Sequence, residues 1–148
     1  MQNDSIKDGS FLVITRHNNA EVFLILRSDK PIWNLPGGGI EDNETPLQAA
    51  IRETNEETGF EVGNLEYIGN YQNINIHTDT IWNRTYLYIT SHYKGIFTPE
   101  FEGCEGKWFP VDSLPKNIQQ ITATRVKDAI ERVPFKDRLF RQTTSVKN

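Results

Sequence analysis

The sequence predicts an α+β domain of the α-β-α sandwich type, with a mixed β-sheet flanked by helices. Runs of β-branched and aromatic residues come first, a capped helix follows, and further strand-like runs precede a second helix. This order is typical of a mixed sheet rather than a doubly wound parallel sheet. No glycine-rich dinucleotide or P-loop fingerprint is present. A length of 148 residues fits one domain, which we expect to span residues 1–148.

Composition narrows the functional classes. With 16 Lys and Arg against 20 Asp and Glu, the formal charge of −4 disfavours a broad nucleic-acid-binding face. The single cysteine, Cys104, excludes an intrachain disulfide and disfavours a cysteine-built metal site. No apolar run approaches the ~20 residues of a membrane helix, and the first residues lack the pattern of a secretory signal. We therefore expect a cytoplasmic protein without a membrane partner.

The first elements are a hairpin and a shaped loop. Residues 10–15 and 21–27 are rich in Val, Ile, Leu and Phe, and a polar turn with two asparagines separates them. This pattern predicts a β-hairpin. In residues 33–39, Pro36 interrupts regular pairing and three glycines allow another group to approach the backbone closely.

A helix with both ends marked is predicted over residues 45–58. Thr45 suits the N-cap, Pro46 the first helical position, and Gln48 completes a capping box. Gly59 is the expected C-terminal stop.

The rest of the chain predicts three strands, a helix and a tail. Alternation of polar and apolar residues indicates antiparallel strands at 65–76 and 80–93, and a short strand is expected at 107–111. Apolar residues then recur at helical spacing before Pro134: Ile118, Ile121, Val126, Ala129, Ile130 and Val133. The polar tail, residues 135–148, is expected to be loosely ordered.

The helix at 45–58 gathers carboxylates on one side. Glu53, Glu56 and Glu57 share one arc, whereas the arc expected to pack comprises Leu47, Ala50, Ile51, Thr54 and Thr58. Glu53 lies three and four residues from the other two glutamates, and those two lie in the last turn of the helix. The like-charge repulsion and the helix dipole together cost very roughly 1–3 kcal/mol. A hard divalent cation would compensate this cost. The alternative is a solvated acidic face, which is the commoner outcome for clustered glutamates, with Arg52 pairing to Glu56.

The wider spacing resembles a known motif. Gly38, five residues, Glu44, seven residues and then residues 52–60, Arg-Glu-Thr-Asn-Glu-Glu-Thr-Gly-Phe, look like the Nudix box, G-x5-E-x7-R-E-U-x-E-E-x-G-U with U apolar. The one departure is Thr54 at an apolar position. Seven fixed positions at roughly 6% usage each make coincidence a poor explanation.

This resemblance implies a Nudix fold in a small, MutT-like single-domain member. It also implies a Mg²⁺- or Mn²⁺-dependent hydrolase that cleaves the pyrophosphate of a nucleoside diphosphate linked to another moiety. We expect a small nucleotide substrate, a (d)NTP or modified nucleotide before the alternatives. Those are an ADP-ribose or nucleotide-sugar pyrophosphatase, an RNA 5′-pyrophosphohydrolase and a non-catalytic nucleotide sensor. A homodimer is left open.

The resemblance also assigns roles to residues. Glu53, Glu56 and Glu57 match the metal-ligating glutamates, with the carbonyl of Gly37 or Gly38 as a further ligand. Glu53 is our candidate for the base that activates water. The catalytic group is completed by Arg52 and Glu44, expected to orient the glutamates. Family members often supply another glutamate from a later loop, for which Glu102 and Glu105 are the candidates, with Glu100 nearby.

Substrate contacts are the hardest to assign. Arg27 suits a phosphate because its guanidinium offers paired donors, and the backbone at Gly38 and Gly39 allows close approach. Trp33 could stack on a base, as could Tyr71 or Trp82, although core packing is the commoner role of such residues. An ordinary exposed arginine is the equal alternative for Arg27. The scattered histidines, His17, His77 and His92, receive no role.

Overall fold

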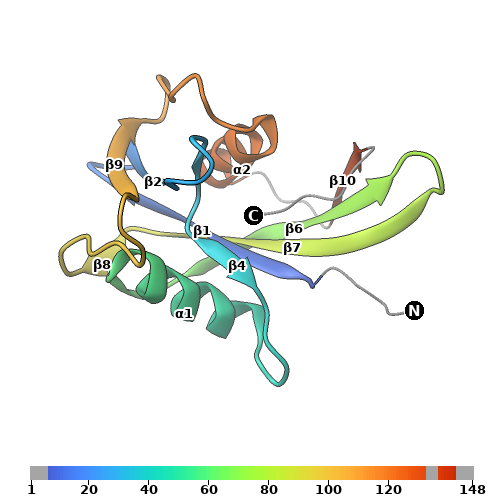
Figure 1. Ribbon diagram of the computed structural model, residues 1–148, viewed down its shortest axis with the longest axis horizontal. Helices are drawn as coiled ribbons and strands as arrows, with labels where there is room; N and C mark the ends of the chain where they lie inside the picture. The colour runs from blue at the N-terminus through green and yellow to red at the C-terminus, as the bar shows by residue number, and fades with distance from the viewer. Residues whose placement is uncertain (1–6, 133–136, 143–148) are drawn as a thin grey trace.

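The computed structural model describes residues 7–132 and the backbone of residues 137–142 (Figure 1). Its strands are β1 (Gly9–Arg16), β2 (Glu21–Leu26), β3 (Trp33–Asn34), β4 (Gly37–Gly39), β5 (Glu61–Gly63), β6 (Glu66–Asn75), β7 (Thr80–Thr90), β8 (His92–Lys94), β9 (Glu105–Pro110) and β10 (Asp137–Gln142). The helices are α1 (Pro46–Thr58) and α2 (Gln120–Glu131).

The main sheet is mixed and lies between the two helices (Figure 1). Its strand order is β10-β6-β7-β1-β2-β3, while β4 pairs with β1 and β9 pairs with β2. The pairs β1·β7 and β10·β6 are parallel and the other pairs are antiparallel. The predicted fold class is therefore confirmed, as are the hairpin β1–β2 and the antiparallel pair β6–β7.

Strand β1 divides the core into two layers. Because successive side chains of a strand point to opposite faces, Phe11 and Val13 pack on the side of α2, with Val126 and Ala129. Leu12 and Ile14 pack on the other side, with Ala50 of α1. The central strand is thus covered on both faces, and its residues are at most 1% exposed from Phe11 to Ile14.

The packing face predicted for α1 is partly wrong. Its buried residues are Ala49, Ala50, Thr54 and Thr58, while Leu47 and Ile51 are 41% and 38% exposed. Small side chains allow the helix to approach β1 and β4 closely, so the contact centres on the alanines and threonines rather than on the larger residues.

Two predicted segments have more regular structure than expected. The glycine loop carries β4, in which Gly37 pairs with Phe11 and Gly39 with Gly9 across β1. Within the predicted tail, residues 137–142 form β10, which runs parallel to β6, and the rest of residues 135–148 lies outside the described residues. Isolated sequence patterns missed both because these strands depend on a partner far away in the chain.

The remaining differences concern element ends. The predicted strand 80–93 is two strands, β7 and β8, and β8 pairs with β5 in a separate two-stranded sheet. Ile118 lies before α2, where it forms an isolated bridge with Trp33, and Val133 lies outside the described residues.

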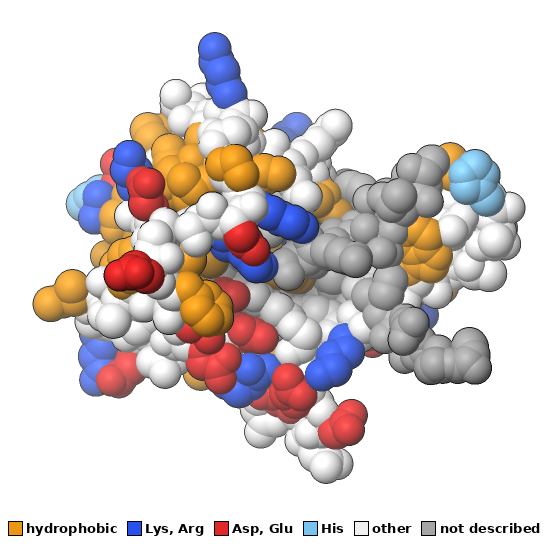
Figure 2. Space-filling model, in the orientation of Figure 1, with side chains coloured by type: hydrophobic (Ala, Val, Ile, Leu, Met, Phe, Trp, Pro, Cys, Tyr) orange, Lys and Arg blue, Asp and Glu red, His pale blue; other side chains and the backbone are white. Residues whose placement is uncertain are grey.

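The visible surface carries no extended stretch of one charge. In Figure 2, acidic side chains with basic ones among them gather over the region where Figure 1 shows α1 and β4. Within the residues that the structure describes, no helix has the length and apolarity needed to cross a membrane.

Candidate functional site

Both ends of α1 are fixed by the residues that the sequence marks. The Thr45 hydroxyl accepts a hydrogen bond from the Gln48 N–H at 3.1 Å, and the Thr45 N–H donates to the Gln48 side chain at 2.9 Å. Gly59 ends the helix in the left-handed conformation, with φ of 79°. The predicted capping box is confirmed. Because it fixes where the helix begins, it also fixes the side of the helix on which the glutamates lie.

The glycine strand β4 lies directly against this acidic face. The N–H of Gly37 donates to Oε1 of Glu57 at 2.8 Å. A Cβ on Gly38 would collide with the Glu53 carboxylate, and a Cβ on Gly37 would collide with the carbonyl of Ser10. Only glycine therefore allows the backbone and the two carboxylates to lie this close together.

Arg52 links the acidic face to the loop before the helix. Its guanidinium donates to both carboxylate oxygens of Glu44, at 2.7 and 3.0 Å, to the carbonyl of Gly39 at 3.0 Å and to Glu56 at 3.2 Å. These hydrogen bonds from Arg52, followed by one from the Glu41 N–H, lower the pKa of Glu44 to about 2. Glu44 is thus ionised at any working pH.

Glu53 and Glu57, whose carboxylates lie against β4, have raised pKa values, in contrast to the lowered pKa of Glu44. Burial raises the pKa of Glu57 to about 8, against the effect of the Gly37 N–H, and Glu53 and Glu100 raise it further. Burial also raises the pKa of Glu53, while Arg52 opposes this shift and Glu56 adds to it. Two half-buried carboxylates therefore lie together with too little positive charge around them.

This donor set suits a hard divalent cation, because carboxylate and carbonyl oxygens are the ligands that Mg²⁺ and Mn²⁺ prefer. The side chains are not gathered around a single point, however. Among the described residues, no three Asp, Glu, His or Cys side chains are arranged as a metal cluster. Glu56 is turned toward Arg52, and Glu57 toward the Gly37 N–H. The metal site therefore stays a prediction.

Glu100, rather than Glu102 or Glu105, lies beside the helix carboxylates. Together with Arg27 and Glu57 it lines a pocket of about 120 Å³ between β2, the end of α1 and residues 95–104, which we name the Glu57 pocket. Glu102 and Glu105 do not line this pocket, and Glu105 pairs with Leu26 in the sheet. The sequence could not distinguish three glutamates in one short segment.

Arg27 and Trp33, two of the predicted substrate contacts, are both held by neighbouring residues, but only Arg27 lies at the site. Arg27 lies at the site, but Asp29 already holds its guanidinium through two hydrogen bonds of 3.0 and 2.9 Å. Trp33 is 6% exposed and packs edge-on against Phe109 with 4.8 Å between ring centroids. In this structure its ring offers no open face to a base, so the assignment of Trp33 to substrate binding is corrected.

The other two aromatic candidates, Tyr71 and Trp82, differ in burial. Tyr71 is fully buried and its hydroxyl donates to Asp128 at 2.8 Å. Trp82 is half-buried on β7. Of the three aromatic residues that the sequence suggested, Trp82 is thus the one that stays a candidate for stacking on a base.

Sequence reasoning missed a second, polar pocket beside Arg27. It measures about 290 Å³ and includes the amide side chains of Asn34 and Gln119, so we name it the amide pocket. The Asn34 carbonyl oxygen accepts from the Leu35 N–H at 2.8 Å and from the Thr122 hydroxyl at 2.9 Å, which fixes the orientation of this amide. The buried Oε1 of Gln119 accepts no hydrogen bond within the described part of the chain. No sequence signal marked these residues, which lie 85 positions apart.

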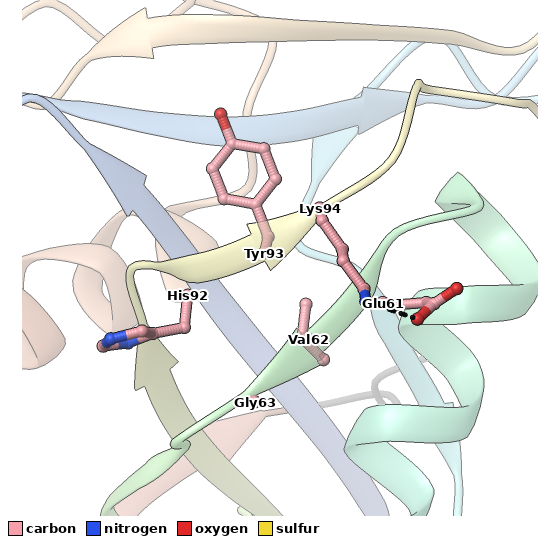
Figure 3. A pocket seen from close by; sticks show the side chains of 6 residues that line it. All are labelled: Glu61, Val62, Gly63, His92, Tyr93 and Lys94. Atoms are coloured by element: carbon pink, nitrogen blue, oxygen red, sulfur yellow. Dashed lines mark ion pairs between the residues drawn. The ribbon is translucent and has the colours of Figure 1, made fainter.

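A larger hollow of about 360 Å³ lies on the β5–β8 sheet (Figure 3). Lys94 points toward Glu61, with 3.6 Å between their charged atoms, while His92 points away from this pair. None of the predicted catalytic residues lines this hollow. Its size alone does not make it the site, because Glu57, the box glutamate whose pKa is raised to about 8, lines the Glu57 pocket instead.

Comparisons with known proteins find relatives over most of the chain. A family model described as NUDIX domain matches residues 7–129. A CMP-5'-(N-acetyl-N-hydroxy-3-aminopropyl)phosphonate hydrolase of Streptomyces rubellomurinus is 30% identical over 115 residues, 75% of this chain and 55% of that protein. An 8-oxo-dGTP diphosphatase of Proteus vulgaris is 46% identical over 55 residues, 34% of this chain and 47% of that protein. The chain thus spans about half the length of these curated relatives.

A solved structure gives the same fold. The crystal structure of a NUDIX hydrolase from Nitrosomonas europaea aligns with a TM-score of 0.78 at 24% identity, covering 95% of this chain and 82% of that one. At this identity the likeness concerns the fold alone.

Proposed function

The chain belongs to the Nudix family, and from this membership we propose that it hydrolyses the diphosphate linkage of a small nucleotide with the help of Mg²⁺ or Mn²⁺. The observation that carries the proposal is the contact of Glu53 and Glu57 with the glycine strand. It brings two glutamates of the Nudix box against a glycine backbone that can approach them closely.

Glu53, Glu56 and Glu57 would hold the metal, with the carbonyl of Gly37 or Gly38 as a further ligand. When bound, the metal neutralises charge on the diphosphate and makes an attacking water more acidic. Glu100 adds a fourth carboxylate, which lines the Glu57 pocket. Without the metal, so acidic a site would repel a polyanionic substrate.

The chain's own residues have distinct tasks in this scheme. Arg52 fixes the rotamer of Glu56 and ties it to Glu44 and to the Gly39 carbonyl. The Gly37 N–H does the same for Glu57. Glu53, half-buried beside Gly38, accepts the proton of the water that attacks phosphorus. Arg27 lines both pockets and so lies where a phosphate would pass between them.

The amide pocket is our proposed site for the nucleobase. Base edges are read by fixed hydrogen-bonding groups, and here the Asn34 amide is oriented while the Gln119 oxygen lacks a partner. This favours a substrate that carries an ordinary or modified nucleobase, in line with the name of the Proteus relative. A sensing domain without catalysis is disfavoured, because all the box glutamates are present.

A substrate panel tests the proposal. It comprises nucleoside triphosphates, oxidised nucleotides, ADP-ribose, nucleotide sugars and 5′-triphosphorylated RNA, each with Mg²⁺, with Mn²⁺ and with EDTA. We expect metal-dependent release of a nucleoside monophosphate from at least one nucleotide. Turnover that persists in EDTA would contradict the metal assignment. Tight nucleotide binding without any turnover would instead establish a sensor.

A further inference from the structure

The Glu57 pocket has an apolar wall that the proposed metal chemistry does not use. The residues that form it include Leu26 from β2 and Phe97 and Phe101 from the β8–β9 loop, residues 95–104. Phe101 is 64% exposed and adjoins the other apolar residues of this wall, so the exposed apolar surface is contiguous with the pocket. Exposed aromatic surface at the mouth of a polar site commonly marks a contact with a ligand.

The β8–β9 loop is fixed relative to the catalytic helix. The N–H of Thr98 donates to the carbonyl of Thr58, the residue after Glu57, at 2.7 Å. Phe97 packs against Phe23 of the core with 5.5 Å between ring centroids. Phe97 therefore gives the pocket a rigid inner wall, while Phe101 stands in solvent at its rim.

The charges of the pocket disfavour a further phosphate beside this wall. Arg27 is the one cation among the residues that line it, and Asp29 already neutralises Arg27 through paired hydrogen bonds. Glu57 and Glu100 are both acidic. An uncharged planar group would avoid this repulsion and would cover the exposed ring of Phe101.

We propose that the apolar wall of the Glu57 pocket binds an uncharged planar group carried by the second phosphate of the substrate, with Phe101 as the stacking residue. The preferred substrate class is then a nucleoside diphosphate esterified to an aromatic group, rather than a free triphosphate. The link to the diphosphate rests on the proposed function; the binding of the ring does not.

Two esters that differ only in the ring test this proposal. The β-phenyl and β-methyl esters of GDP and of ADP have the same charge, so electrostatics cancels in the comparison. With Mg²⁺, we expect kcat/KM for the phenyl esters to exceed that for the methyl esters by roughly tenfold, the scale of one aromatic stack. Phe101→Ala should bring each pair to within about twofold, chiefly by lowering the rate of the phenyl ester, while Phe101→Tyr keeps the preference.

Ile96→Ala is the matched control, because Ile96 is 84% exposed on the same loop but does not line the pocket. It should leave all four rates unchanged. Equal rates for the two esters in the wild-type protein, or a phenyl preference that survives Phe101→Ala, would overturn the proposal.

Cys104 offers a readout that does not depend on turnover. It lines the pocket and is the one cysteine of the sequence, so a thiol reagent reports on this place alone. Methylene-bridged analogues of the two esters cannot be hydrolysed. We expect the phenyl analogue to slow the labelling of Cys104 severalfold more than the methyl analogue, and Phe101→Ala to abolish the difference. If no substrate is turned over, the proposed function fails, and labelling still decides whether the ring binds; equal protection refutes the subsite.

Discussion

The backbone N–H of Gly37 donates a hydrogen bond of 2.8 Å to Oε1 of Glu57, a residue 20 positions later in the chain. This bond joins the strand that borders the site to the last turn of the helix that supplies its carboxylates. It also means that the glycine strand does more than leave room for a ligand, because it orients one of the proposed metal ligands directly.

The glycines of β4 are expected to respond differently to substitution. Gly38→Ala places a methyl group against the flexible end of Glu53, so the protein should fold while activity falls by about 10- to 100-fold. Gly37→Ala meets the backbone at Ser10 and has a φ of 151°, so it should lower the free energy of unfolding by a few kcal/mol. Thermal melts and kcat/KM measured on both variants separate these effects.

Gly63→Ala, on β5, is the control for this series. Its added methyl group would meet no atom within 4 Å, so melting temperature and activity should change little. A Gly38→Ala protein as active as the wild type would show that Glu53 need not stay where the structure places it.

Arg52→Lys tests whether the paired geometry of the guanidinium matters. Lysine keeps the charge but cannot hold Glu44, Glu56 and the Gly39 carbonyl at once. Loss of a residue that orients ligands typically costs 10- to 100-fold in metal affinity or activity, and we expect a decrease of that order. The pKa of Glu44, which Arg52 lowers to about 2, should rise toward its ordinary value in a carboxyl NMR titration.

Arg84→Lys, at an exposed position of β7, is the control and should change neither the activity nor the pKa of Glu44. If Arg52→Lys likewise retained full activity and full metal affinity, the guanidinium would be acting only as a positive charge.

The local features of this fold could be predicted from the sequence, and the non-local ones could not. Thr45, Gln48 and Gly59 act on backbone groups a few residues away, so their roles could be predicted without knowing the rest of the structure. The shared face of Glu53 and Glu57 could likewise be predicted, because it follows from the periodicity of the helix that contains both residues. The pairing of the glycine strand with β1, by contrast, depends on residues far away along the chain.

The candidate site shows the same division. Asn34 and Gln119 share a pocket only because β3 and the start of α2 meet in space. Glu100 lines the Glu57 pocket because of the path of the loop, whereas Glu102 and Glu105 have the same chemistry and nearly the same sequence position. Trp33 was assigned to substrate by residue type, but burial placed its ring in the core.

The titration of Glu57 should make the metal-free protein lose stability as pH rises. Its folded-state pKa is raised from 4.5 to about 8, so its favourable contribution is full below pH 4.5 and is lost by about pH 8. Glu57→Gln removes this dependence. In EDTA, the variant should therefore gain stability relative to the wild type between pH 5 and 8, by roughly 2 to 4 kcal/mol after allowance for solvent screening.

Mg²⁺ should reverse the order of the two proteins at pH 8, because metal binding requires the ionised carboxylate. Denaturant unfolding at several pH values, with and without Mg²⁺, measures both effects. Glu61→Gln, an exposed carboxylate on β5, is the control and should follow the wild type. Parallel stability curves for wild type and Glu57→Gln would contradict the pKa assignment, and an active Glu57→Gln protein would contradict its role as a ligand.

Gln119→Met should raise stability while lowering activity. The buried Oε1 of Gln119 accepts no hydrogen bond in the described structure, and such a group costs about 1–3 kcal/mol, which an apolar side chain of similar shape would recover. In the proposed function this oxygen accepts a hydrogen bond from the nucleobase. The same change should therefore reduce kcat/KM about tenfold or more for the best nucleotide and bring the kcat/KM values for different bases closer together. Gln120→Met, at the exposed neighbouring position, controls for the added methionine. A higher melting temperature together with lower activity is the expected signature, because a purely structural role for Gln119 predicts a higher melting temperature with unchanged activity.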